Sequence, residues 1–166
     1  MIVLVLNCGS SSIKYQVIDI DNNNNALLAK GLVDRIGLAE GSLTHKPAGK
    51  EKYELVMPIA DHTTGISLVL KALTDKEHGV IAELSDVKAV GHRVAHGGEF
   101  FKQSVVVDED VKAKIRSLFE IAPLHNPANL EGVLSIEKVL PGIPQVAVFD
   151  TSFHQMYILL RNQIVT

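Results

Sequence analysis

The chain contains a single cysteine, Cys8, and no tryptophan, and aromatic residues make up only 5% of its 166 residues. One cysteine excludes an internal disulfide, which is usual for proteins of the cytoplasm, and we expect that location. No apolar run reaches the roughly 18 residues of a membrane-spanning helix, and the first residues lack the basic segment of a secretory signal. We therefore expect neither a membrane partner nor a signal peptide.

The sequence also lacks a basic cluster, since 16 Lys and Arg residues against 19 Asp and Glu residues give a net charge of −3. This balance argues against a nucleic-acid partner. The hydrophobic content of 46% and the mean hydropathy of +0.19 are typical of a globular protein with a buried sheet. The length suffices for one well-buried domain, or for an α/β unit with a small subdomain.

The N-terminal segment predicts a β-hairpin with a polar tip. Two β-branched apolar runs, 2–6 and 13–20, flank a turn at 7–12 that carries an amide, a glycine and three hydroxyls, with Lys14 just beyond it. Free backbone N–H groups, hydroxyls and an ammonium suit an anion, and phosphate best of all. The turn matches neither the Walker A pattern nor Gly-x-Gly-x-x-Gly, so a serine-rich turn without a ligand remains the alternative.

The remaining pattern predicts further strands and three helices. The strand regions are 26–33, 37–54 (short strands outside the core), 87–95 and 145–149. The helices begin at Thr63 or Thr64, at Asp108 with an apolar face running to Ala122, and at Asn126–Pro127. Strands that come first and helices that alternate with strands later predict an α/β fold, in which helices cover a mixed sheet.

A second polar segment, Gly91–Glu99, surrounds the end of a predicted buried strand. The guanidinium of Arg93 needs an anion there and matches a carboxylate or phosphate with two parallel hydrogen bonds; a structural ion pair is the alternative. His92 and His96 have the spacing of a helical zinc pair, but in a strand they would lie about 13 Å apart. A shared metal is therefore disfavoured.

Two more candidates follow at the ends of predicted elements. His125 comes just before a helix N-terminus, where the helix dipole favours an anion and a neutral, hydrogen-donating imidazole. A histidine that only packs a loop is the other interpretation. Asp150 follows the strand at 145–149, at the end where α/β sheets bind their ligands, although it could equally cap a helix.

Taken together, these segments closely resemble the acetate kinase family, which includes propionate kinases. The motifs that carry the resemblance are Asn7–Lys14, Gly91–Glu99, Ala122–Asn129 and Val148–Gln155, which agree in order and spacing. The resemblance implies the actin-like ATPase (ribonuclease H-like) fold. It also implies an enzyme that uses Mg²⁺ and transfers the γ-phosphoryl of ATP to acetate or another short-chain carboxylate, giving an acyl phosphate and ADP.

The resemblance also implies roles for single residues. For the nucleotide and metal, Asn7 would help to hold Mg²⁺, Lys14 would contact the nucleotide, and the phosphates would be reached by Ser10 and Ser12. The substrate would be bound by Arg93, Ala95 and Leu124. His125 would donate to the transferring phosphoryl group, and Asp150 would be the acid or base. A carboxylate with a pKa of about 4 to 5 is already ionised at neutral pH and needs no base. We therefore expect Asp150 to orient Mg²⁺, its waters or a catalytic cation.

Ala95 bears on the choice of carboxylate, because it follows Arg93 by two residues and shares its strand face. Many acetate kinases look to have valine at this position, whereas the propionate kinases that resemble them carry alanine. The smaller side chain leaves room for about one or two methylenes, which extends the expected substrates to propionate.

The resemblance covers residues 1–155 as an N-terminal domain, and 156–166 form an atypical tail that looks truncated or frame-shifted. Members of the family are more than twice as long, and their second, nucleotide-binding domain is not recognisable in this sequence. An N-terminal fragment that folds without catalysing the reaction is therefore the alternative to an active kinase. The family looks homodimeric, an arrangement that this fragment need not share. A sugar kinase is disfavoured, since a sugar hydroxyl gives Arg93 no anion.

Overall fold

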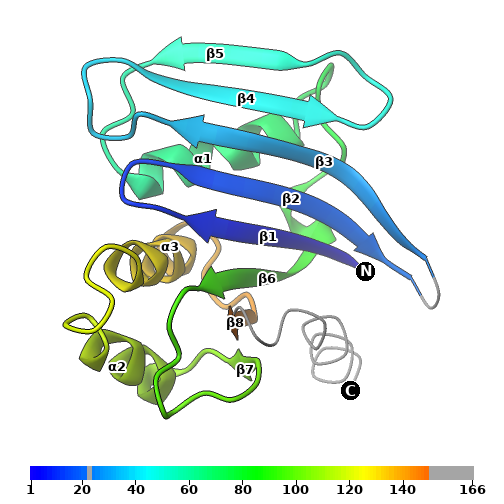
Figure 1. The fold of residues 1–166 in the computed structure, drawn as a ribbon. Helices are drawn as coiled ribbons and strands as arrows, with labels where there is room; N and C mark the ends of the chain where they lie inside the picture. The colour runs from blue at the N-terminus through cyan, green and yellow to red at the C-terminus, as the bar shows by residue number, and fades with distance from the viewer. Residues whose placement is uncertain (22–23, 150–166) are drawn as a thin grey trace.

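The structure is a computed structural model that describes residues 1–21 and 24–149. Within these residues eight strands form one mixed sheet in the order β5-β4-β3-β2-β1-β6-β8-β7 (Figure 1). The strands are β1 (Ile2–Cys8), β2 (Ile13–Ile20), β3 (Asn25–Asp34), β4 (Gly41–Pro47), β5 (Tyr53–Met57), β6 (Val87–Val94), β7 (Val105–Val106) and β8 (Gln145–Phe149). Strands β1 to β5 pair antiparallel, whereas β1, β6 and β8 are parallel neighbours. The predicted mixed α/β sheet is confirmed.

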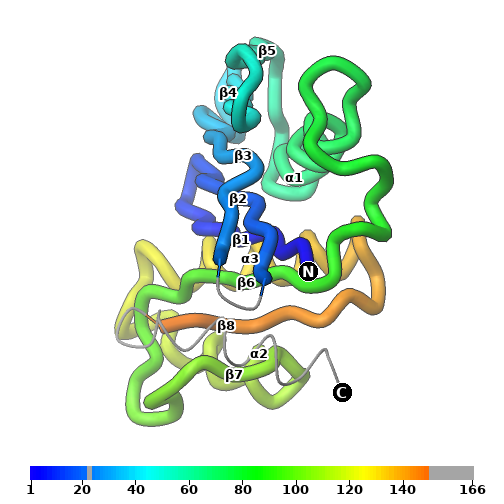
Figure 2. The backbone as a smooth tube through the Cα atoms, turned by 90° about the vertical axis from the view of Figure 1, so that its right-hand side faces the viewer, coloured from blue at the N-terminus to red at the C-terminus, as the bar shows by residue number. Residues whose placement is uncertain are grey.

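The helices gather on one side of this sheet. They are α1 (His62–Leu73), α2 (Glu109–Ser117) and α3 (Asn126–Val139), with a short 3₁₀ turn, η1 (Leu84–Asp86). Helix α1 lies behind the strands in Figure 1, and Figure 2 shows it on one side of them. Ile136 of α3 belongs to the same core cluster as Ile66 of α1. No helix within the described ranges is long and apolar enough to cross a membrane. Because the helices cover one face of the sheet, strand residues on the opposite face can form a site.

Both faces of the central strands carry apolar residues, which explains why 2–6 reads as a continuous apolar run. Leu4 and Leu6 of β1 pack in the core under the helices together with Ile66 of α1. Val3 and Val5 point to the other face and belong to a separate buried cluster. The strict alternation of a strand then directs Asn7, the next residue of that second set, to the same face as Val5.

Three expectations need correction. Helix α1 starts two or three residues earlier than the sequence indicated, because its N-cap is Asp61, which accepts a 2.7 Å hydrogen bond from the Thr64 backbone N–H. Asp108 does cap α2, but that helix ends at Ser117 rather than continuing to Ala122. The short strands expected in region 37–54 are β4 and β5, the second of which extends to Met57, yet β4 belongs to the core, since Leu43 and His45 are fully buried.

A tyrosine crosses the meander on its helix-covered face. Tyr15, Gly31 and His45 are successive cross-strand partners on β2, β3 and β4. Because Gly31 has no side chain, the Tyr15 ring lies over it and its hydroxyl reaches Nδ1 of His45 at 2.7 Å. His45 Nε2 lies 2.9 Å from the His78 carbonyl oxygen, to which it donates. Burial lowers the pKa of His45, so the imidazole stays neutral and both of its nitrogens are satisfied.

We expect Gly31→Ala to destabilise the fold by about 1–3 kcal/mol, because the new Cβ would collide with the Tyr15 ring and the Thr44 carbonyl. Urea unfolding followed by circular dichroism measures the change. Lys30→Ala is the matched control on the exposed face of the same strand, with an expected change within about 0.5 kcal/mol. Equal stabilities for the two variants would contradict the steric role of Gly31.

Candidate active site

Side chains of two helices form hydrogen bonds with the turn between β1 and β2. The Cys8 carbonyl accepts a 2.7 Å hydrogen bond from Nδ2 of Asn129 in α3. The Gly9 carbonyl lies 2.6 Å from Nε2 of His62, the first residue of α1, which donates to it. Two carbonyl groups of the turn are thereby occupied by donors from the helix layer.

Backbone donors take up two further carbonyls of this turn. The Ser11 carbonyl accepts from the Ile36 N–H at 2.9 Å, and the Ser12 carbonyl accepts from the Gly9 N–H at 2.8 Å. In the described part of the chain, no acceptor takes the backbone N–H of Ser10, Ser11 or Ser12. A turn with occupied carbonyls and available N–H groups has the polarity of an anion-binding nest.

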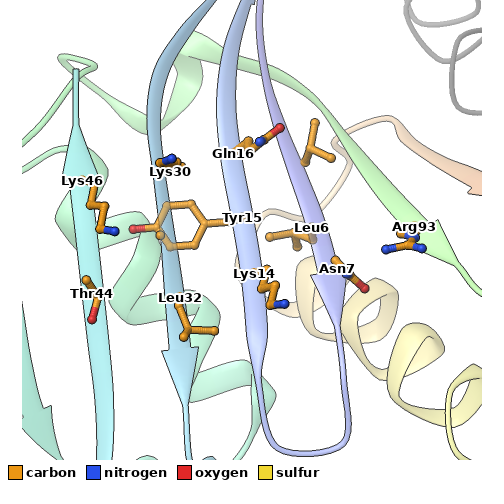
Figure 3. Close-up of a pocket in the computed structure, with 12 residues that line it drawn as sticks. Leu6, Asn7, Lys14, Tyr15, Gln16, Lys30, Leu32, Thr44, Lys46 and Arg93 are labelled. Carbon is orange, nitrogen blue, oxygen red and sulfur yellow. The ribbon is translucent and has the colours of Figure 1, made fainter.

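A pocket of about 590 Å³ lies beside this turn, on the sheet face opposite the helices. The polar residues that line it are Asn7, Lys14, Gln16, Lys30, Thr44, Lys46 and Arg93 (Figure 3). Asn7 and Lys14 are cross-strand partners on β1 and β2. Arg93 follows His92, the β6 partner of Leu6, and therefore comes next to Asn7 on the same face. The sheet register thus brings together three of the predicted site residues.

The other predicted residues lie outside the lining of this pocket. Ser10 and Ser12 belong to the turn, with Ser10 exposed and Ser12 half-buried. His125 is the N-cap residue of α3 and Leu124 precedes it; both are exposed, Leu124 at 76%. Asp150 lies outside the described residues. Within the described residues, the structure therefore joins the turn, Lys14 and Arg93, and leaves His125 and Leu124 at the nearby end of α3.

The two histidines of the Gly91–Glu99 segment have separate surroundings. His92 is buried on the helix-covered face of β6, where its Nε2 lies 2.6 Å from Oε1 of Gln145. His96 lies beyond the end of β6, and its Nδ1 accepts from the Gly98 N–H at 3.0 Å. Burial lowers the pKa of His92 from 6.5 to about 4. His92 is therefore a neutral core residue that supports the strand carrying Arg93.

Sequence reasoning missed three residues that hold the site together: His62, Asn126 and Asn129. Asn126 accepts from the His96 N–H at 3.2 Å and donates to the His96 carbonyl at 3.0 Å. Asn129 accepts from the Ala95 N–H at 3.0 Å. One signal in the sequence could have identified Asn126 and Asn129. They lie three positions apart at the start of a helix with an apolar face, and buried amides need hydrogen-bond partners.

The buried His92 predicts a pH-dependent stability. Its folded pKa lies below its unfolded value, so below pH 6.5 the unfolded state binds more protons than the folded state. Stability should therefore be full above pH 6.5 and decrease as the pH falls toward about 4. This group contributes a loss of about 3 kcal/mol. Urea unfolding across this range measures it.

His92→Gln removes the titrating group and should flatten the dependence on pH, even where it lowers stability overall. Above neutral pH the free-energy difference between variant and wild type should stay constant, which serves as the internal control. A variant whose stability declines with acid as steeply as that of the wild type would contradict a neutral, buried His92.

Comparison with known proteins supports one family. The model of the acetokinase family matches residues 2–159. Over 155 residues, the chain is 52% identical to the acetate kinase of Caldanaerobacter subterraneus subsp. tengcongensis and 55% identical to that of Heliobacterium modesticaldum. Each match covers 93% of this chain and 38% of the relative. The chain thus spans little more than a third of the length of these relatives.

Solved structures agree with the sequence comparison. The crystal structure of Porphyromonas gingivalis acetate kinase superposes with a TM-score of 0.87 at 45% identity, covering 93% of this chain and 38% of that one. A propionate kinase from Francisella tularensis gives a TM-score of 0.79 at 36% identity, with the same coverage. Since the family model matches nearly the whole chain and the fold agrees, this protein belongs to the acetokinase family.

Proposed function

We propose that this chain is the N-terminal part of a short-chain carboxylate kinase that converts ATP and acetate into acetyl phosphate and ADP. The observation that carries the proposal is the convergence of Asn7, Lys14 and Arg93 on one pocket beside the serine turn, in a member of the acetokinase family. Groups for an anionic substrate and for phosphates then lie side by side, as phosphoryl transfer requires.

In the proposed reaction a carboxylate oxygen forms a bond to the γ-phosphorus while the bond from that phosphorus to ADP breaks. ADP leaves with the electron pair, and no proton is transferred. Arg93 would bind the carboxylate through its guanidinium and place the attacking oxygen. Lys14 and the N–H groups of the serine turn would neutralise phosphate charge, and His125 would donate to the transferring group. The chain's own contribution is thus positioning and charge neutralisation.

The residues present are compatible with Mg²⁺. Asn7 is half-buried at the pocket and offers an amide oxygen, and Mg²⁺ commonly uses one or two protein ligands together with substrate phosphates. When bound, the ion would offset charge on the phosphates. Among the described residues no group of three or more His, Cys, Asp or Glu could hold a metal. Asp150 remains our candidate for orienting the ion and its waters, since the ionised nucleophile needs no base.

A second function is favoured by one observation, namely that the chain spans 38% of its relatives. If the nucleotide-binding part of the family lies in the portion that this chain does not span, the 166 residues fold and bind anions without turnover. Binding of phosphate or acetate without formation of acyl phosphate distinguishes this alternative from an active kinase.

Trapping with hydroxylamine decides between the two. The purified chain is incubated with Mg-ATP, hydroxylamine and acetate, propionate or butyrate, and the acyl hydroxamate formed from the acyl phosphate is measured. Hydroxamate that depends on the carboxylate and on Arg93 supports the kinase. A folded, pure sample that forms none would refute turnover by this chain and favour the inactive N-terminal part.

We expect Arg93→Ala to raise the KM for the carboxylate and also to lower kcat, with kcat/KM falling about 100-fold, because a charge-assisted pair of hydrogen bonds is lost. Arg116→Ala is the matched control, since Arg116 is an exposed arginine of α2 outside the pocket. A rise in KM alone would argue against a role of Arg93 in the transition state.

Ala95→Val should favour acetate over propionate by about tenfold, since the added methyl groups occupy the space proposed for the longer substrate. The ratio of hydroxamate yields measures this preference, and NMR titration with each carboxylate measures it without turnover. Ala113→Val adds the same methyl groups on an exposed position of α2 and serves as the control. An unchanged ratio in Ala95→Val would remove Ala95 from the substrate site.

A further inference from the structure

Two backbone segments that are distant in the sequence meet at the start of α3. Cys8 ends β1 and leads into the serine turn, and Ala95 follows β6 two residues after Arg93. The side-chain amide of Asn129 bridges the two segments, because Nδ2 donates to the Cys8 carbonyl at 2.7 Å and Oδ1 accepts from the Ala95 N–H at 3.0 Å. The partners fix the orientation of the amide, since a carbonyl can only accept and an N–H can only donate.

Burial gives this bridge its strength. Asn129 is 5% exposed, so a competing water does not readily replace either hydrogen bond. Gly132, one turn further along α3, allows this close approach, because a Cβ there would lie 2.6 Å from the Cys8 Sγ. Helix α3 therefore sits directly against the end of β1, and Asn129 is the polar contact at that point.

We propose that Asn129 is a positioning residue that sets the distance between the anion-binding turn and the carboxylate-binding Arg93. The proposal rests on the proposed function, in which the turn holds phosphate and Arg93 holds the carboxylate. A ligand that contacts both groups at once, such as acetyl phosphate, depends on this distance. A ligand that contacts only one group, such as inorganic phosphate, does not.

Asn126 provides a matched control on the same helix. It is also buried and also makes one accepting and one donating hydrogen bond, but both go to His96. Asn126→Ala thus removes the same chemistry from the same end of α3 without touching the turn. Asn129→Asp offers a second variant of nearly equal shape, which keeps the acceptor for Ala95 and loses the donor to Cys8.

Amide hydrogen exchange tests the bridge without any ligand. The Ala95 N–H reports the first hydrogen bond directly, and the Gly9 N–H reports the second, because it belongs to the same peptide unit as the Cys8 carbonyl. Asn129→Ala should accelerate exchange of both N–H groups together, each by about tenfold. Asn129→Asp should accelerate exchange of the Gly9 N–H alone. Asn126→Ala should accelerate His96 and leave Gly9 unchanged. The Val69 N–H in α1 reports global stability in every variant. Unchanged exchange at Gly9 in both Asn129 variants, with the Val69 control unaffected, would overturn the proposal.

Ligand titration followed by NMR adds a measurement that a purely structural role would not alter. Wild type should bind acetyl phosphate more tightly than inorganic phosphate, and Asn129→Ala should lose about tenfold of that preference while retaining most of its affinity for phosphate. A preference that persists in Asn129→Ala would contradict the proposal. A wild type without any preference would instead contradict the proposed function, and hydrogen exchange would still decide the role of Asn129.

Discussion

The parallel pairing of β1 with β6 places Asn7 and Arg93, the two polar residues at the centre of the candidate site, side by side. Leu6 and His92 are partners in this ladder, so Asn7 and Arg93, each the next residue along its strand, emerge at the same edge and on the same face. Parallel strands end at a common edge, and α/β sheets bind their ligands there. The hairpin then adds Lys14 from β2 beside Asn7. A shift of one residue in the β1–β6 register would turn Arg93 into the helix-covered core.

The helix layer contributes more than hydrophobic cover. Its buried polar side chains satisfy backbone groups of the site: His62 holds the Gly9 carbonyl from α1, and Asn129 holds the Cys8 carbonyl from α3. On the helix-covered face of the sheet, His92 of β6 and Gln145 of β8 form a hydrogen bond with one another. Every described buried side-chain nitrogen or oxygen has a partner. Because a buried polar group without a partner costs about 1–3 kcal/mol, these contacts tie the geometry of the site to the stability of the core.

Local patterns predicted much of the fold, because periodicity and turn chemistry act over a few residues. The hairpin, the strands near 26–33 and 87–95 and the helix that starts at Asn126–Pro127 are confirmed. The sequence favours a threonine as the cap of α1, whereas the cap is Asp61, because several residues in succession could cap the same helix. The core position of β4 was missed, since His45 reads as polar and is buried only through its contacts with Tyr15 and the His78 carbonyl.

The sequence by itself determined which residue types are available, which of them alternate on one strand face, and to which family the four motifs point. Residue types and alternation follow from covalent order and the period of two of a strand. Only the tertiary structure decided that Asn7, Lys14 and Arg93 share a pocket, whereas His92 faces the core and Asn129 bridges two strand ends. These outcomes depend on strand order, register and helix docking, which arise from contacts between residues far apart in the chain.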